Sequence, residues 1–119
     1  MDSAQLVRRS EHEFKNNANH GIAGELMNED FVHRLPCRGL PPGRAGTRAA
    51  GELVTGAIHD IHVEIPLILT EGDLVAGRVE AAGVRAGTGA PLTWAENHIY
   101  RVIDGHITGL WPAGGPQLG

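Results

Sequence analysis

The residues best suited to chemistry lie two positions apart near the C-terminal end of the chain, at Glu96 and His98. A carboxylate and an imidazole are the side chains that most often transfer protons in enzymes. Trp94 and Tyr100 flank the pair at the same spacing of two. Successive side chains of a strand alternate between its faces, so an extended segment would place all four on one wall of a pocket.

That segment, residues 92–103, is predicted to be a strand followed by a tight turn at Asp104-Gly105 and a returning strand at residues 106–111. One face of the first strand carries Leu92, Trp94, Glu96, His98, Tyr100 and Val102. The opposite face carries Thr93, Ala95, Asn97, Ile99, Arg101 and Ile103. Neither face is uniformly apolar, so the pattern leaves open which one is buried. In the alternative, Glu96 and His98 simply meet water, as on the open face of an antiparallel sheet.

Length and charge limit the classes of protein to consider. The 119 residues suffice for one domain, expected over residues 1–119, and the formal charge of −4 with scattered basic residues argues against binding nucleic acid. No apolar run approaches membrane-spanning length and the polar N-terminus lacks a signal-peptide core, so we expect a cytoplasmic protein without a membrane partner. The lone Cys37 fits that reducing compartment and is interpreted as structural or incidental, not as a nucleophile.

The elements that must position the pair follow from periodicity and turn signals. Three helices are predicted at about residues 2–17, 22–27 and 44–55, the last burying Ala45, Ala49, Leu53 and Val54. Residues 56–60 are expected to form a turn, and further strands are predicted at residues 29–36, 61–69 and 74–85, with Gly77 and Gly83 marking bends or bulges. Helices followed by an antiparallel meander indicate an α+β fold, with the helices on one face of a curved sheet.

Four stretches in this order and spacing carry a resemblance that covers nearly the whole chain. They are EDFVHRLP at residues 29–36, GLPPGRAG at 39–46, EGDLVAGR at 71–78 and NHIYRVIDGHI at 97–107, followed by Trp111. In these motifs the sequence resembles the SnoaL-like polyketide cyclases, a family of the nuclear-transport-factor-like and ketosteroid-isomerase-like superfold.

The resemblance implies a cone-shaped α+β barrel, with three N-terminal helices packed in a strongly curved, mainly antiparallel sheet around a deep pocket. It implies a homodimer, no metal or organic cofactor, and a hydrophobic or polyketide-like substrate of secondary or antibiotic metabolism. Such enzymes remove a proton next to a carbonyl and let the carbanion attack a second carbonyl of the same molecule. The implied pocket is lined by Phe14, Phe31, His33, Leu35, Trp94, Glu96, His98 and Tyr100.

One departure from the family pattern affects the expected chemistry. The family often has an acidic general base directly after the tryptophan of the last strand, where this chain has Pro112. Proline cannot transfer a proton, so we expect Glu96 to replace that base, with a pKa raised by burial. His98 is then expected to orient or polarise the substrate, while Trp94 and Tyr100 grip it.

Two alternatives to acid–base ring closure remain. Epoxide opening or pericyclic closure would rely mainly on shaping the substrate. A non-catalytic binding or dimerisation module is the other, because one fold serves many functions. The seven histidines do not predict a metal site, since His59 and His62 lie near a turn and the others are scattered, without the spacing of a ligand set.

Overall fold

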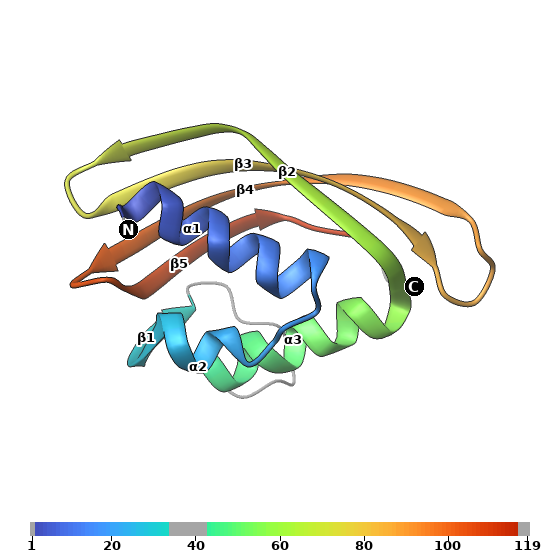
Figure 1. Ribbon diagram of the computed structural model, residues 1–119, viewed down its shortest axis with the longest axis horizontal. Coiled ribbons are helices and arrows are strands. Elements are labelled where there is room, and N and C mark those ends of the chain that lie inside the picture. The colour runs from blue at the N-terminus through green and yellow to red at the C-terminus, as the bar shows by residue number, and fades with distance from the viewer. Residues whose placement is uncertain (1, 34–42, 117–119) are drawn as a thin grey trace.

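A computed structural model describes residues 2–33 and 43–116 (Figure 1). Its helices are α1 (Ser3–Glu11), η1 (His12–Asn16), α2 (Ile22–Leu26) and α3 (Gly43–Ala57). Its strands are β1 (Met27–His33), β2 (Ile58–Glu71), β3 (Leu74–Arg85), β4 (Pro91–Ile103) and β5 (His106–Gly114). Leu35 and Cys37 lie outside the described residues.

The five strands form one curved sheet in the order β1-β5-β4-β3-β2. Neighbouring strands are antiparallel except β1, which runs parallel to β5. The helices lie together on the inner side of the curved sheet (Figure 1). The expected α+β cone with a mainly antiparallel sheet is therefore confirmed.

The N-terminal helix starts where its sequence predicts but changes geometry before it ends. Asp2 caps it: the Asp2 carboxylate accepts from the Gln5 amide at 2.8 Å, and the Gln5 side chain accepts from the Asp2 amide at 3.0 Å. Its side chains Leu6 and Val7 are buried. From His12 the expected continuous helix becomes the π-helical turn η1. Such turns are rare and often mark functional sites.

The prediction of which residues are buried holds for Val54, which is half-buried against the core, but is otherwise wrong for α3. Its buried positions are Gly46 and Gly51, whereas Leu53 is 55 % exposed. A Cβ atom at position 51 would lie only 2.3 Å from Cε1 of Phe14. Glycine is thus needed at this position for α3 to pack closely against η1, a requirement that an apolar periodicity does not reveal.

The irregularities expected in β3 lie in its neighbour β2. The predicted turn at residues 56–60 is wrong, because α3 continues to Ala57 and β2 begins directly after it at Ile58. The β2–β3 register shifts between His59 and His62 and again between Glu64 and Leu67. β3 itself pairs with β4 without a break, so Gly83 marks no bulge. A Cβ there would instead come within 2.5 Å of the Ile58 side chain.

Two apolar clusters fill the space between helices and sheet. The larger consists of Leu6, Val7, Ile22, Ala23, Leu26, Met27, Phe31, Val75, Tyr100, Val102, Ile107 and Leu110. The smaller consists of Ile58, Ile61, Val63, Ile65, Val79 and Ala81.

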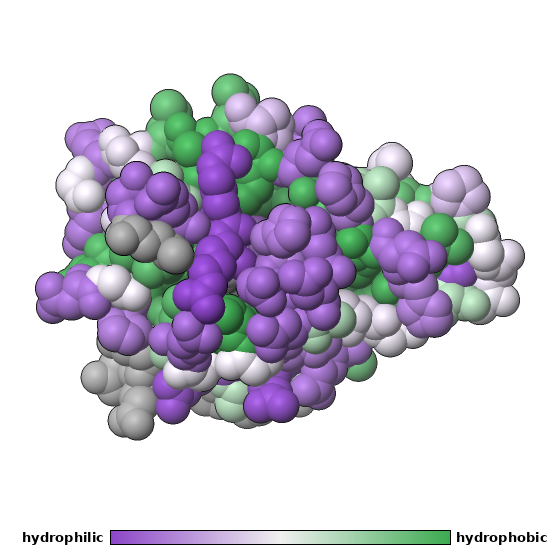
Figure 2. All heavy atoms as spheres, viewed as in Figure 1, coloured by the Kyte–Doolittle hydropathy of each residue, from purple (hydrophilic) through white to green (hydrophobic). Residues whose placement is uncertain are grey.

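Hydrophilic side chains gather over α1 on the face shown in Figure 2. None of the helices in the described part of the chain is long and apolar enough to cross a membrane.

Candidate active site

A cavity of about 350 Å³ opens between the helices and the inner face of the sheet. Its apolar wall includes Phe14, Met27, Ala50, Val54, Leu110, Pro112 and Pro116. Its ionisable side chains are Glu11, Lys15, Glu96, His98 and Tyr100. An apolar hollow with a few converging polar groups is the usual form of a small-molecule site.

Strand β4 supplies three of these ionisable groups by simple alternation. Glu96 and His98 are only 5 % and 7 % exposed, and Tyr100 is buried beside them. Between them, Asn97 and Ile99 point outward and are exposed. The face of β4 that carries the Glu96–His98 pair is therefore the inner one, and the alternative in which both side chains simply meet water is wrong.

Glu96 is held by three donors. Its Oε1 accepts hydrogen bonds from Lys15 Nζ and His98 Nε2, each at 2.6 Å. Its Oε2 accepts from Trp94 Nε1, also at 2.6 Å. Burial raises the pKa of Glu96, but the His98 hydrogen bond and the Lys15 charge outweigh burial and lower it to about 2. The expected raised pKa is thus wrong, and Glu96 is a carboxylate at neutral pH.

Lys15 connects Glu96 to a second buried carboxylate, Glu11. The Lys15 Nζ lies 2.7 Å from Glu11 Oε2, off the direction of a good hydrogen bond, and Tyr100 OH donates to Glu11 Oε1. Burial lowers the pKa of Lys15, but Glu11 and Glu96 together raise it above 10.5. Burial, then Glu11, raises the pKa of Tyr100 well above 10. Both groups therefore keep their protons at neutral pH.

The His98 ring has one nitrogen engaged and one without a partner. Because an ionised carboxylate only accepts hydrogen bonds, Nε2 must carry the proton shared with Glu96. The Nδ1 atom is buried, and no hydrogen-bond partner for it exists among the described residues. In the neutral ring with Nε2 protonated, Nδ1 carries a lone pair. The Tyr100 ring stands edge-on to His98, with 5.9 Å between ring centres.

The other side chains expected in the pocket divide between three places. Phe14 lines the cavity from η1 and meets His20 edge-on, with 5.2 Å between ring centres. Phe31 packs into the larger apolar cluster, and Trp94 packs against the smaller one while donating to Glu96. Neither is among the lining residues, because each ring is taken up by core packing. His33 is the last residue of β1, but its side chain is not described. Leu35 lies outside the described residues.

Sequence reasoning missed Glu11 and Lys15. Two signals were available: the residues are four apart, which places them on one side of a helix, and Lys15 is the only lysine in the chain. Pro112 lies opposite His98 in the β4–β5 pairing and lines the cavity. It occupies the position where the family often has an acidic base, which is why another base was sought.

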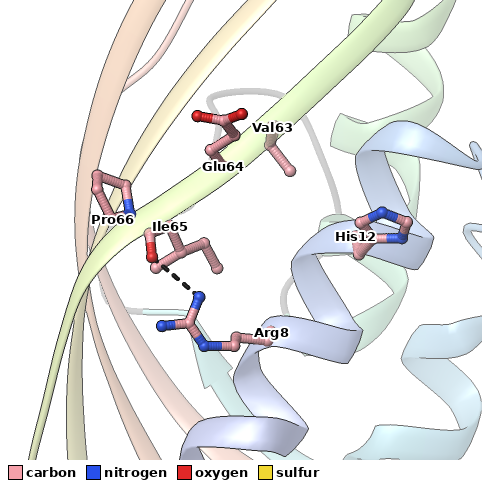
Figure 3. A pocket seen from close by; sticks show the side chains of 6 residues that line it. All are labelled: Arg8, His12, Val63, Glu64, Ile65 and Pro66. Carbon is pink, nitrogen blue, oxygen red and sulfur yellow. Dashed lines mark hydrogen bonds between the residues drawn. The ribbon is translucent and has the colours of Figure 1, made fainter.

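A second hollow of about 370 Å³ lies between the N-terminal helix and β2 (Figure 3). It is lined by Arg8, His12, Val63, Glu64, Ile65 and Pro66. Arg8 Nη1 donates to the Ile65 carbonyl at 2.9 Å, at the second register shift of β2. Nowhere in the described ranges do three or more His, Cys, Asp or Glu side chains form a group able to hold a metal ion.

Comparison with known proteins identifies the family. The SnoaL-like polyketide cyclase family matches residues 5–113, which is most of the sequence. The chain belongs to this family. Among curated proteins, none matches the SnoaL-like chain significantly.

Solved structures share the fold of this SnoaL-like protein. IdmH from Streptomyces antibioticus, provisionally a polyketide cyclase, is 26 % identical with a TM-score of 0.82, covering 96 % of this chain and 92 % of its own. TsrD from Streptomyces laurentii is 19 % identical with a TM-score of 0.81, covering 96 % and 90 %. AclR from Streptomyces galilaeus, provisionally a hydroxylase, is 20 % identical with a TM-score of 0.81, covering 97 % and 90 %.

Proposed function

We propose that this SnoaL-like protein closes a ring on an uncharged polyketide-like molecule, as an enzyme of secondary metabolism, with His98 as its general base. The observation that carries the proposal is the buried His98–Glu96 pair. The carboxylate fixes the proton on Nε2, and Nδ1 has no partner among the described residues. A carboxylate that orients a histidine base is a recurring catalytic arrangement.

The proposed reaction rearranges bonds within one molecule. Nδ1 of His98 takes a proton from a carbon next to a carbonyl group, and the electron pair of that C–H bond forms a new C–C bond to a second carbonyl carbon. The oxygen of the second carbonyl gains the displaced electron pair and then the proton from the imidazolium. Glu96, 2.6 Å from Nε2, stabilises the imidazolium while it exists. The product is an isomer of the substrate, so no co-reactant is required.

This division of roles differs from the one expected from sequence alone. With a pKa of about 2, Glu96 has little tendency to take a proton from carbon at neutral pH. We therefore assign it the orienting role and His98 the base. The acid that the family often has after the last tryptophan is then unnecessary. His98 is paired with Pro112 on the neighbouring strand, so a base is already present beside that position.

Deuterium exchange into 1-tetralone, a small uncharged bicyclic ketone, tests the proton transfer without knowledge of the natural substrate. In D₂O, NMR should show faster loss of the hydrogens next to the carbonyl with the wild-type protein than with buffer. His98→Ala should return the rate to the buffer value. His106→Ala, an exposed histidine at the start of β5, should behave as wild type. Equal exchange with wild type and His98→Ala would contradict the assignment of His98 as base.

A second candidate function is ring closure by substrate shaping, through epoxide opening or a pericyclic reaction. The largely apolar cavity wall, with Phe14 projecting into it from η1, favours this candidate. Shaping predicts turnover that is independent of pH and survives the Glu96→Gln/His98→Ala double substitution. Tight binding of cyclic ketones without any turnover would instead indicate a non-catalytic binding module.

We also propose that the chain forms a homodimer through the outer face of its sheet. Leu69, Ala76, Ile99 and Trp111 are paired in one row across β2, β3, β4 and β5. Leu69 is 73 % exposed and Ile99 is also exposed, so the row presents apolar surface that a second copy could cover. Light scattering at micromolar concentration should give twice the chain mass, and Ile99→Lys should shift it toward the monomer. A monomeric wild type would contradict this proposal.

A further inference from the structure

The hydrogen-bonding groups of the buried charged network nearly all satisfy one another. Both oxygens of Glu96 accept from donors, and Glu11 Oε1 accepts from Tyr100 OH. Glu11 Oε2 accepts no hydrogen bond but lies 2.7 Å from the Lys15 ammonium group. A ligand in the cavity therefore finds no carboxylate oxygen without a cation or a donor beside it. What the network leaves for a ligand must come from Lys15 or His98.

Lys15 is the one donor in this network with capacity to spare. An ammonium group has three N–H bonds. Two carboxylates lie within 2.7 Å of Nζ, and no third acceptor is present among the described residues. The side chain lines the cavity and is 15 % exposed. It lies on the π-helical turn η1, which also presents Phe14 to the cavity.

The charges of the network indicate the kind of oxygen to which that third N–H can donate. Glu11 and Glu96 carry two negative charges against the single positive charge of Lys15, all within hydrogen-bonding distance. A ligand carboxylate placed there would meet two buried carboxylates and be repelled, since like charges interact strongly away from water. An uncharged carbonyl oxygen avoids that repulsion and still accepts a hydrogen bond.

We infer that Lys15 binds the carbonyl oxygen of an uncharged ketone or ester, so that the site selects neutral carbonyl compounds over free acids. This inference rests on the proposed function and names its substrate class. As His98 removes the neighbouring proton, negative charge moves onto the same carbonyl oxygen. A hydrogen bond from an ammonium group strengthens as that charge develops, so Lys15 both selects the substrate and stabilises the enolate.

The wild-type protein alone can test the binding part, because Lys15 is the only lysine. Protein grown on ¹⁵N-labelled lysine has a single side-chain Nζ resonance. Adding 1-tetralone should shift this resonance, whereas tetralin, which has the same shape without the carbonyl group, should not. 1-Tetralone should bind about tenfold more tightly than tetralin, as expected for a hydrogen bond to a charged donor. The carboxylate 1,2,3,4-tetrahydro-1-naphthoate should bind more weakly than either.

A charge-balanced variant tests whether Lys15 causes the preference. Lys15→Met with Glu11→Gln removes one positive and one negative charge together, and the new amide oxygen can still accept from Tyr100 OH. The preference for 1-tetralone over tetralin should fall to about one in this variant. Arg9→Met with Glu25→Gln, which removes an exposed ion pair of α1 and α2, is the matched control and should keep it.

The outcomes separate this inference from the proposed function. Equal binding of 1-tetralone and tetralin to wild type, or an Nζ resonance that 1-tetralone leaves unmoved up to its solubility limit, would show that Lys15 is only structural. Either result stands even if the Lys15→Met double variant fails to fold. These measurements need no turnover, so a carbonyl preference without deuterium exchange would support the Lys15 site and count against His98 as base.

Discussion

Two hollows of nearly equal volume differ in almost everything else. The groove beside β2, of about 370 Å³, has lining side chains that include the exposed Arg8, His12 and Glu64. The cavity under β4, of about 350 Å³, holds Glu96 and His98 at 5 % and 7 % exposure. Each hollow contains a histidine and a glutamate, so the presence of this pair of residue types and the volume would not separate them. Burial separates them, because hydrogen bonds and charges act strongly only where water is excluded.

The same comparison explains what each set of polar groups does. In the groove, Arg8 completes the hydrogen bonding of a strand carbonyl at an irregular point of β2. In the cavity, the charged groups pair with one another in the interior and leave Nδ1 of His98 without a protein partner among the described residues. Buried polar atoms without a partner are uncommon in proteins and call for an explanation. A bound substrate is the explanation we propose.

The largest expected difference is in catalytic rate, between matched substitutions of the two glutamates. Glu96→Gln should lower the rate of deuterium exchange into 1-tetralone by on the order of 10²–10⁴, because the imidazolium loses the carboxylate that stabilises it. Glu64→Gln, at the exposed groove, should leave the rate unchanged. If the wild-type rate instead fell as the pH was lowered through about 4.5, and Glu96→Gln abolished this fall, Glu96 itself would be the base.

Acid stability should give the next largest difference. The pKa of Glu96 falls on folding from about 4.5 to about 2, so its contribution is present above pH 4.5 and disappears as pH drops through 2. The contribution is about 3 kcal/mol, at about 1.4 kcal/mol for each pKa unit. Urea unfolding at several pH values should show that, between pH 4.5 and 2, the free energy of unfolding of wild type falls by this amount more than that of Glu96→Gln. Glu64→Gln should follow wild type, and parallel curves for all three proteins would contradict the buried ion pair.

A glycine pair on α3 tests whether the cavity wall is as closely packed as its geometry indicates. A Cβ on Gly51 would lie 2.3 Å from Phe14, whereas one on Gly56 would meet nothing within 4 Å. Gly51→Ala should therefore destabilise the protein by about 1–3 kcal/mol and weaken binding of 1-tetralone. Gly56→Ala should stabilise it by up to about 1 kcal/mol, since alanine favours helix. Thermal unfolding of both variants would show whether their effects differ in sign.

The smallest effect should come from the groove. Arg8→Ala removes the donor to the Ile65 carbonyl and should cost about 1 kcal/mol of unfolding free energy, with no change in exchange rate. Arg48→Ala, an exposed residue of α3, is the control and should cost less. A loss of exchange activity in Arg8→Ala with normal stability would mean that the groove, and not the cavity under β4, takes part in the reaction.

The sequence was most informative where one local rule decides the structure. Alternation along β4 correctly placed Glu96 and His98 together, and turn signals correctly placed β3 between residues 74 and 85. Both depend on periodicity and on residues that favour turns. The start of α1 was predicted correctly, because Asp2 is a residue type that caps helices. Its end was not, because the predicted helix ran on through the π-helical turn η1.

It was least informative where distant segments meet. The ionisation of Glu96 depends on Lys15, which lies 81 positions away and reaches it from η1. No pattern within β4 contains that contact, so burial alone suggested the wrong direction for the pKa. Gly51 is similar: its role depends on the ring of Phe14, and apolar periodicity favoured Leu53, which is exposed.

The burial of Lys15 also has a consequence for labelling and acylation. A reagent that reacts with lysine side chains has one target in this chain, and that target is enclosed and held in its unreactive protonated form by two carboxylates. Activated acyl thioesters, which acylate exposed amines on most proteins, would find no lysine on this surface.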